Sequence, residues 1–416
     1  MRKLFFWLHL SAGVIAGLII LVMSITGVVL TYERQIGEWS RRSLRSAPPG
    51  PDAARLPVET LLAHARRDFP DRAVTGLTLS ARRDAPAVLA AEPEPLYLDA
   101  YTGASLGSPE GEGVRAFLAA TRSWHRWLAA EGDGRALGRA ITGWSNLLFL
   151  FIVVSGMYLW IPRVWTHVQF RSVVWFRRRY GSSKARDFNW HNVIGIWSAI
   201  PLFIVVLGAV PISFPWASDA IYRLVGEAPP VRGGRPAGPP RQRREGRPPS
   251  ETAASIEGLN GLWARAEASQ SDWKTINLRF PRRDRDPLVF SIDRGNGGQP
   301  QLRSTLTLDR AGAVVDQETF SDQTLGRQIR SVLRFAHTGE VLGVTGQTVA
   351  GLASAGAVVM VWTGLALSWR RWRAWAARGR TAVLSSPVSG DTSSARQWTN
   401  GAAATAEPNR AWRQES

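Results

Sequence analysis

Cysteine is absent from all 416 residues, and histidine occurs only six times. The lack of cysteine excludes disulfide frameworks, iron–sulfur clusters, cysteine-based zinc sites and thiol nucleophiles. Any metal chemistry must therefore use histidine, carboxylate, methionine or tyrosine side chains.

Charge of either sign is missing from four long stretches, although 20% of the whole chain is charged. A bilayer crossing takes about 20 apolar residues, and soluble cores rarely hold uncharged runs of that length. We therefore predict four transmembrane helices, over residues 4–32, 140–162, 191–218 and 341–369. The first is too long for a cleaved signal peptide, and no small-residue cleavage site precedes Tyr32.

The positive charge of the chain, formally +18, is concentrated beside these stretches. Arg2 and Lys3 precede the first span, the loop 163–190 is strongly basic, and five arginines follow the fourth span between residues 370 and 380. Basic flanks remain in the cytoplasm, so both termini are predicted inside, in a bacterial inner membrane. No folded basic groove is evident, so we do not expect nucleic-acid binding.

Two segments, 33–139 and 219–340, then lie outside the cytoplasm. Their alternating apolar patterns predict two small α+β modules, one within 33–139 with its core at 56–107, the other at 251–340. Residues 219–250 are read as a linker rich in Pro and Arg, and 380–416 as a disordered tail. The expected strands cover residues 74–79, 87–90, 96–99, 275–280, 288–292 and 304–308.

The chain is predicted to be internally duplicated. Each half runs in the order span, helix, strands, turn, helix, span. The segments "LYLDAYTGASLG" and "LTLDRAGAVVDQ" occupy matching places, and each is followed by a helical stretch with a histidine before the next span.

Four histidines mark the predicted spans. His9 and His191 lie early in spans one and three, at the cytoplasmic face, whereas His125 and His337 precede spans two and four, at the outer face. A haem iron with two axial imidazoles needs one histidine from each of two facing helices. The pattern thus predicts two haem sites, one ligated by His9 and His191 and one by His125 and His337. Pairing within a half would have to cross a core of about 30 Å, too far for one iron.

Small and basic residues near these histidines fit such sites. Gly13, Gly195 and Gly343 follow His9, His191 and His337 and could open a slot for a flat macrocycle, while Arg126 and Arg139 could pair with haem propionates. The same residue types also occur in membrane proteins for simpler reasons. A lone interfacial histidine is usually a polar anchor, and glycine also serves helix packing. Zinc or copper could bind imidazoles as well, although two histidines without cysteine or carboxylate make a thin zinc site.

The blocks that carry these histidines resemble the PepSY-associated transmembrane family, whose members are often called iron-regulated membrane proteins. The resemblance covers about residues 1–375. It rests on "W-x-H" at His9, "H-R-W-L" at His125, "D-x-x-x-H-x-x-x-G" at His191 and "H-x-G" at His337. The two outer modules look like divergent PepSY units, whereas 228–250 and the tail lie outside the pattern.

The resemblance implies a membrane reductase that holds two b-type haems and reduces ferric siderophores or other Fe(III) chelates outside the cytoplasm. Fe(II) is softer than Fe(III) and binds hard oxygen donors more weakly, so a one-electron transfer releases the metal. The sequence has no dinucleotide-binding signature, so quinol or a separate reductase is expected to supply electrons. One alternative is a non-redox interaction or inhibitory module. The other is a metal or haem transporter, which fits less well because such proteins usually carry intramembrane acidic residues and these spans have none.

Overall fold

The computed structural model describes residues 1–108, 112–161, 166–231, 257–281 and 286–384. It divides into two compact units, Met1–Trp369 and Arg370–Ser416. All elements discussed below belong to the first unit, except that the last helix continues beyond Trp369 into the second.

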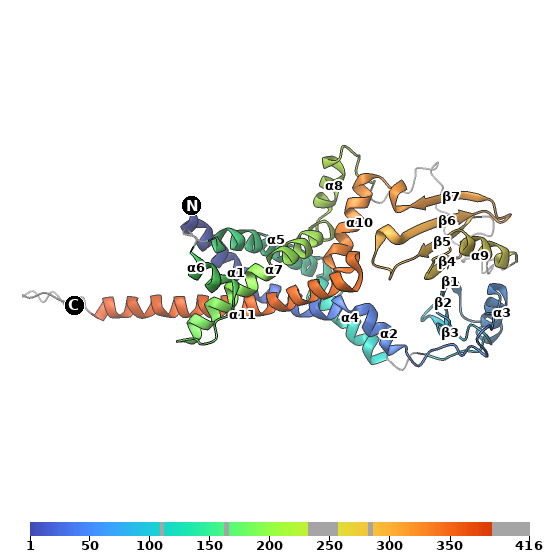
Figure 1. Ribbon diagram of the computed structural model, residues 1–416, viewed down its shortest axis with the longest axis horizontal. Helices are drawn as coiled ribbons and strands as arrows, with labels where there is room; N and C mark the ends of the chain where they lie inside the picture. Colours follow the sequence, from blue (N-terminus) through green and yellow to red (C-terminus); the bar gives the residue numbers. More distant parts are fainter. Residues whose placement is uncertain (109–111, 162–165, 232–256, 282–285, 385–416) are drawn as a thin grey trace, which may run out of the picture. The chain divides into compact units, whose positions relative to one another are not determined.

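Within the part of the chain that the structure describes, four helices are long and apolar enough to cross a membrane. They are α1 (Arg2–Thr31), α5 (Gly134–Trp160), α7 (Ser183–Ser213) and α11 (Gly343–Leu384) (Figure 1). The third of these helices, α7, ends at Ser213, whereas the predicted span continues to residue 218. Pro215 lacks a backbone N–H and fits the first turn of a helix, so a separate helix, α8 (Pro215–Leu224), begins there.

The long helices pack through small and branched side chains. Val153 of α5, Leu202 of α7, and Ala353 and Ala357 of α11 form a buried cluster. An added Cβ at Gly356 would lie 2.7 Å from Ser198 Oγ, so a larger residue would displace Ser198 where α11 meets α7. Close packing of this kind is the main attraction between helices in lipid.

Shorter helices connect the spans to the rest of the chain. α2 (Glu33–Ser40) follows α1, α4 (Glu112–Trp127) precedes α5, and α10 (Leu325–His337) precedes α11. α4 packs on α1 and α5, and α10 packs on α7 and α8. The predicted basic loop 163–190 contains α6 (His167–Val174) and the first turns of α7.

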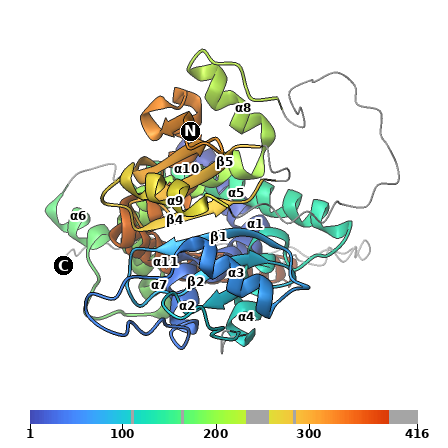
Figure 2. The ribbon, with the colours of Figure 1, turned by 90° about the vertical axis from the view of Figure 1, so that its right-hand side faces the viewer.

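The strands form one antiparallel sheet in the order β3-β2-β1-β4-β5-β6-β7. Two helices, α3 (Val58–Asp68) and α9 (Leu259–Ala268), cover one face of this sheet, as Figure 2 shows. The strands are β1 (Val74–Ser80), β2 (Ala87–Ala91), β3 (Leu96–Leu98), β4 (Thr275–Arg279), β5 (Leu288–Asp293), β6 (Arg303–Leu308) and β7 (Val314–Thr319).

The structure differs here from the two separate modules predicted. β1 of the first half pairs with β4 of the second, from Gly76↔Arg279 to Ser80↔Thr275. Leu77 and Leu278 are both fully buried in one hydrophobic cluster that draws on both halves. An edge strand with unpaired backbone groups is stabilised by any matching edge, so the two sets of strands gain by joining. In each half the joined strand is the first one after the helix that covers the sheet.

The remaining predictions, for the strands, the linker and the tail, agree with the structure only in part. Six strands lie where the alternation placed them, within one or two residues at their ends. β7 was missed, because its residues are mostly exposed and carry no apolar alternation. The predicted linker 219–250 begins inside α8 and otherwise falls largely on 232–250, outside the described residues. Of the predicted tail, residues 380–384 belong to α11, and the rest lies outside the described part.

Candidate functional site

The structure brings His125 and His337 together at the end of the bundle that faces the sheet. Their ring centroids are 6.2 Å apart, with an angle of 44° between the planes. His125 lies near the end of α4 and His337 is the last residue of α10, so two short helices from the two halves present one imidazole each.

The spacing of these rings suits two ligands of one metal ion. A bond from a metal to an imidazole nitrogen is about 2 Å long, and the ring centroid lies about 1 Å behind that nitrogen, so two opposed ligands have centroids about 6 Å apart. The separation of 6.2 Å is of this size.

His9 and His191 form the second pair, inside the spans. His9 is on α1 and His191 on α7, and they are near enough to interact electrostatically. The side chain of Arg2, seven residues before His9 on α1, donates to the backbone oxygen of Leu159 at the end of α5. This pair therefore belongs to the end of the bundle where α1 begins and α5 ends.

Each of the four imidazoles is held by its Nδ1 atom against a neighbouring helix. His9 contacts Ser155 Oγ at 2.9 Å and His125 contacts Thr26 Oγ1 at 2.9 Å. The other two meet backbone oxygens, His191 that of Met360 at 3.1 Å and His337 that of Val205 at 2.8 Å.

These contacts assign the tautomer, which fixes the nitrogen that is available to a ligand. A carbonyl oxygen can only accept, so Nδ1 of His191 and of His337 carries the proton. The hydroxyls of Ser155 and Thr26 already donate to carbonyls of their own helices, so they too accept from Nδ1. No described residue forms a hydrogen bond with Nε2 of any of the four, so each Nε2 keeps a lone pair, as a metal-ligating histidine requires.

The pair nearer the sheet is uncharged at neutral pH. Burial, and then the repulsion that would arise if His125 and His337 were both protonated, lowers the pKa of His125 to about 4. Burial also lowers the pKa of His337. A neutral imidazole is the form that binds metal.

Glycines lie against all four histidines, but they are not the glycines that the sequence suggested. An added Cβ would lie 3.5 Å from the His125 ring at Gly27, 3.2 Å from that of His9 at Gly156 and 3.4 Å from that of His191 at Gly364. At Gly208 it would lie 2.5 Å from the Leu333 oxygen and 3.2 Å from Cβ of His337. The first three directly follow the hydroxyl residues Thr26, Ser155 and Thr363, a repeated pair that the sequence displays and that could have identified them.

The glycines predicted from helical spacing have other surroundings. A Cβ at Gly13 would meet nothing within 4 Å, and one at Gly195 would lie 3.6 Å from Met360 Sδ. Gly343 has a φ of 65°, a left-handed backbone that begins α11. Gly13 thus leaves room beside its helix, Gly195 packs against Met360, and Gly343 serves a turn.

Arginines gather near His125. Burial, followed by the charges of Arg139, Arg122 and Arg334, lowers the pKa of Arg126. The predicted residues Arg126 and Arg139 are therefore near each other, and sequence reasoning missed the other two. Like charges in one place repel, so an anion such as a carboxylate would stabilise the group.

Among the described residues, no three or more His, Asp or Glu side chains gather closely enough to hold a bare metal ion. A haem would not need such a cluster, since its macrocycle supplies four of the six iron ligands and the protein only the axial two. The donor set present, two neutral imidazoles with free Nε2 atoms, fits that group.

Comparison with known families agrees with a membrane protein of apolar helices. The family described as PepSY-associated TM region matches residues 6–371. The chain belongs to this family. The match includes α5, α7 and the strands, and it begins within α1 and ends within α11. The resemblance proposed from the sequence is confirmed. No curated protein matches the chain.

Membership of the PepSY-associated family and the four apolar helices together identify a membrane protein. The family description names no cofactor, substrate or reaction, so these can be inferred only from the site.

Proposed function

We propose that this protein is a di-haem electron-transfer protein of the bacterial inner membrane, and that it reduces ferric siderophores or other Fe(III) chelates outside the cytoplasm. The observation that carries the proposal is the pair His125 and His337, with ring centroids 6.2 Å apart and both Nδ1 atoms bound elsewhere. A hydrogen-bonded Nδ1 orients the ring and raises the basicity of Nε2, the usual support for a metal-ligating histidine.

The residues have distinct tasks in this proposal. His125 and His337 would hold one b-type haem as axial ligands, and His9 and His191 the other. Arg126 and Arg139, with Arg334, would neutralise propionates at the first site. A bound haem iron accepts and gives up single electrons at a potential set by its ligands and its burial.

The other parts of the chain supply orientation and containment. The buried apolar cluster of α5, α7 and α11 would keep water out of the helix bundle, and the backbone contacts of His191 and His337 fix the direction of their rings. Quinol or a separate reductase would supply electrons, because no nucleotide-binding motif is present in the sequence. Basic residues flank the start of α1, the end of α5, the start of α7 and the end of α11. The opposite ends of these spans connect to α2, α4, α8 and α10, in keeping with a sheet outside the cytoplasm.

The test is the absorption spectrum of the purified full-length protein, oxidised and then reduced with dithionite, together with the haem content. We expect a Soret band that shifts on reduction and about two haems per chain. His337→Ala and His191→Ala should each lower the ratio to about one, because each removes one axial ligand. His167→Ala is the matched control, since His167 is exposed at the start of α6.

A colourless protein, or one whose haem content is untouched by both substitutions, contradicts the proposal. A colourless protein whose cellular effect survives the histidine substitutions would favour the interaction module, and metal uptake by such a protein would favour the transporter.

A further inference from the structure

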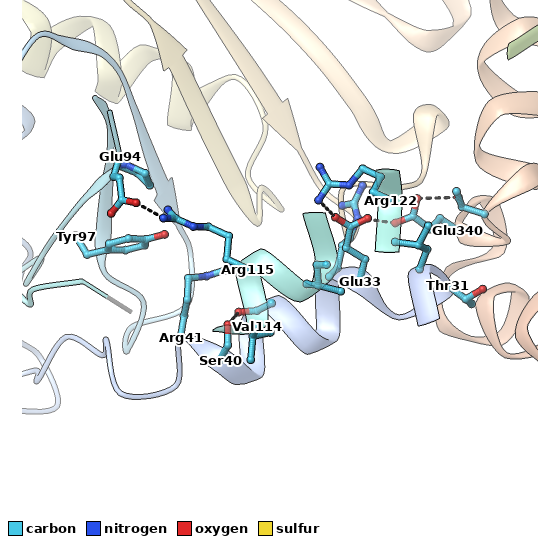
Figure 3. A pocket seen from close by; sticks show the side chains of 16 residues that line it. Thr31, Glu33, Ser40, Arg41, Glu94, Tyr97, Val114, Arg115, Arg122 and Glu340 are labelled. Carbon is cyan, nitrogen blue, oxygen red and sulfur yellow. Dashed lines mark hydrogen bonds and ion pairs between the residues drawn. The ribbon is translucent and has the colours of Figure 1, made fainter. Parts of the chain in front are cut away.

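A cavity of about 540 Å³ lies between the sheet and the helices that carry the first histidine pair. It is bounded by the end of α1, by α2, α4 and β3, and by the residues just after α10 (Figure 3). Binding sites for small molecules commonly have volumes of about 300–1,000 Å³. The cavity is therefore large enough for a metal chelate.

The wall of the cavity continues directly into the helices that hold the imidazoles. Arg122 lines it one turn before His125, and Thr338 lines it immediately after His337. Thr31 lies five residues beyond Thr26, the residue that holds His125. A molecule in the cavity would thus contact residues that lie within one helical turn of His125 and His337, the two ligands of the same proposed haem.

Seven charged residues line the cavity, and six of them form ion pairs. Arg34 pairs with Glu340 at 2.5 Å, Arg122 with Glu33 at 2.5 Å, and Arg115 with Glu94. Glu340 is buried, and Arg34 also donates to the backbone oxygen of Gly297, so the first pair is well fixed.

Arg41 is the seventh, and no described residue forms an ion pair with it. Its side chain is partly buried and lies beside Gly37, whose added Cβ would be 3.2 Å from the guanidinium. The lining therefore carries one uncompensated positive charge. A partly buried guanidinium prefers an anion with paired oxygen atoms, such as a carboxylate.

We propose that this cavity binds an anionic, oxygen-ligated Fe(III) chelate, and that Arg41 selects it by charge. The inference rests on the proposed function, because it assigns the place where that function meets its substrate. In the reaction each Fe(III) gains one electron and becomes Fe(II), which its oxygen donors hold more weakly. A quinol supplies the electrons by losing two electrons and two protons for every two chelates reduced.

The test separates binding from electron transfer by using gallium(III) citrate, a redox-inert stand-in for ferric citrate. Its affinity is measured by titration calorimetry on the full-length protein, for the wild type and for Arg41→Gln and Arg41→Glu. We expect about tenfold weaker binding for Arg41→Gln and a larger loss for Arg41→Glu, because a charge-assisted contact is first removed and then reversed. Arg42→Glu is the matched control, since Arg42 stacks on Trp39 and does not line the cavity.

Each outcome decides the matter. Absence of binding by the wild type, or equal losses for the Arg41 and Arg42 variants, overturns the inference. Metal-free citrate that binds as tightly as the gallium chelate also overturns it, since the cavity would then be a general anion site. If the protein has no Soret band but binds the chelate in a way that depends on Arg41, the inference about the cavity stands and the haem proposal is refuted. The two proposals can therefore be tested separately.

Discussion

The two histidine pairs are held in similar ways but have different surroundings. His125 and His337 lie on short helices beyond the spans, next to a cluster of arginines and to the cavity beside the sheet. His9 and His191 lie within α1 and α7, and their neighbours are Ser155, Gly156 and the corresponding residues of α11.

This difference suggests a division of labour. A site among polar residues and beside a cavity is suited to exchange electrons with a soluble molecule, whereas a site between apolar helices is suited to pass them on. The same ring support, an Nδ1 proton bound by a neighbouring helix, serves both.

The largest expected effect separates the pairs by kinetics. In His191→Ala, dithionite-reduced protein should still be reoxidised by ferric citrate at the wild-type rate, while turnover driven by quinol is lost, because only the relay site is removed. His337→Ala should abolish both. Stopped-flow absorbance at the Soret band measures the first and anaerobic chelate reduction the second. If His191→Ala slowed reoxidation as much as His337→Ala, the division of labour would be wrong.

A smaller effect tests the fit of the helices at the site near the sheet. Gly208→Ala places a methyl group 2.5 Å from the Leu333 oxygen and must displace α10, whereas Gly27→Ala meets His125 at an ordinary contact distance. Overpacking of this kind costs about 1–3 kcal/mol. In a His191→Ala background, where haem content reports this site alone, Gly208→Ala should therefore lose most of its haem and Gly27→Ala very little. Equal retention would argue against a close contact between α7 and α10.

The smallest effect concerns the redox potentials. Thr26→Val and Ser155→Ala each remove a hydroxyl that accepts from an imidazole Nδ1. The ring then becomes a weaker donor to Fe(III), so the midpoint potential should rise, by about 59 mV if the relative affinity changes tenfold. Spectroelectrochemical titration should show Thr26→Val moving one of two potentials and Ser155→Ala the other. A shift of both by either variant would contradict two separately supported sites.

The sequence predicts the spans and most strands well because both depend on local composition. Uncharged runs identify helices in lipid, and the alternation around Leu77 or Leu278 identifies strands with one buried face. The union of β1 with β4 could not be predicted, since it depends on which edges meet in space. The end of span three at Ser213 could have been inferred from Pro215.

The candidate site was predictable in its histidines but not in what holds them. The order of spans alone places His125 and His337 at one face. The residues that bind their Nδ1 atoms, Thr26 and the Val205 backbone, lie 99 and 132 positions away along the chain, and a backbone oxygen leaves no mark in a sequence. Arg334 was overlooked for a related reason, because only the approach of α10 to α4 adds it to the cluster. Arg122 lies one turn before Arg126 on the same helix, so helical spacing could have identified it.

The joining of β1 to β4 also bears on how the chain is made. Until residues 275–279 have left the ribosome, β1 exposes a row of backbone groups with nothing to bind. A fragment that stops before β4 would keep that open edge, and the simplest way to close it is antiparallel association with a second copy of itself. Truncated forms of this protein should therefore aggregate or dimerise through Gly76–Ser80, which the intact chain protects during its own synthesis.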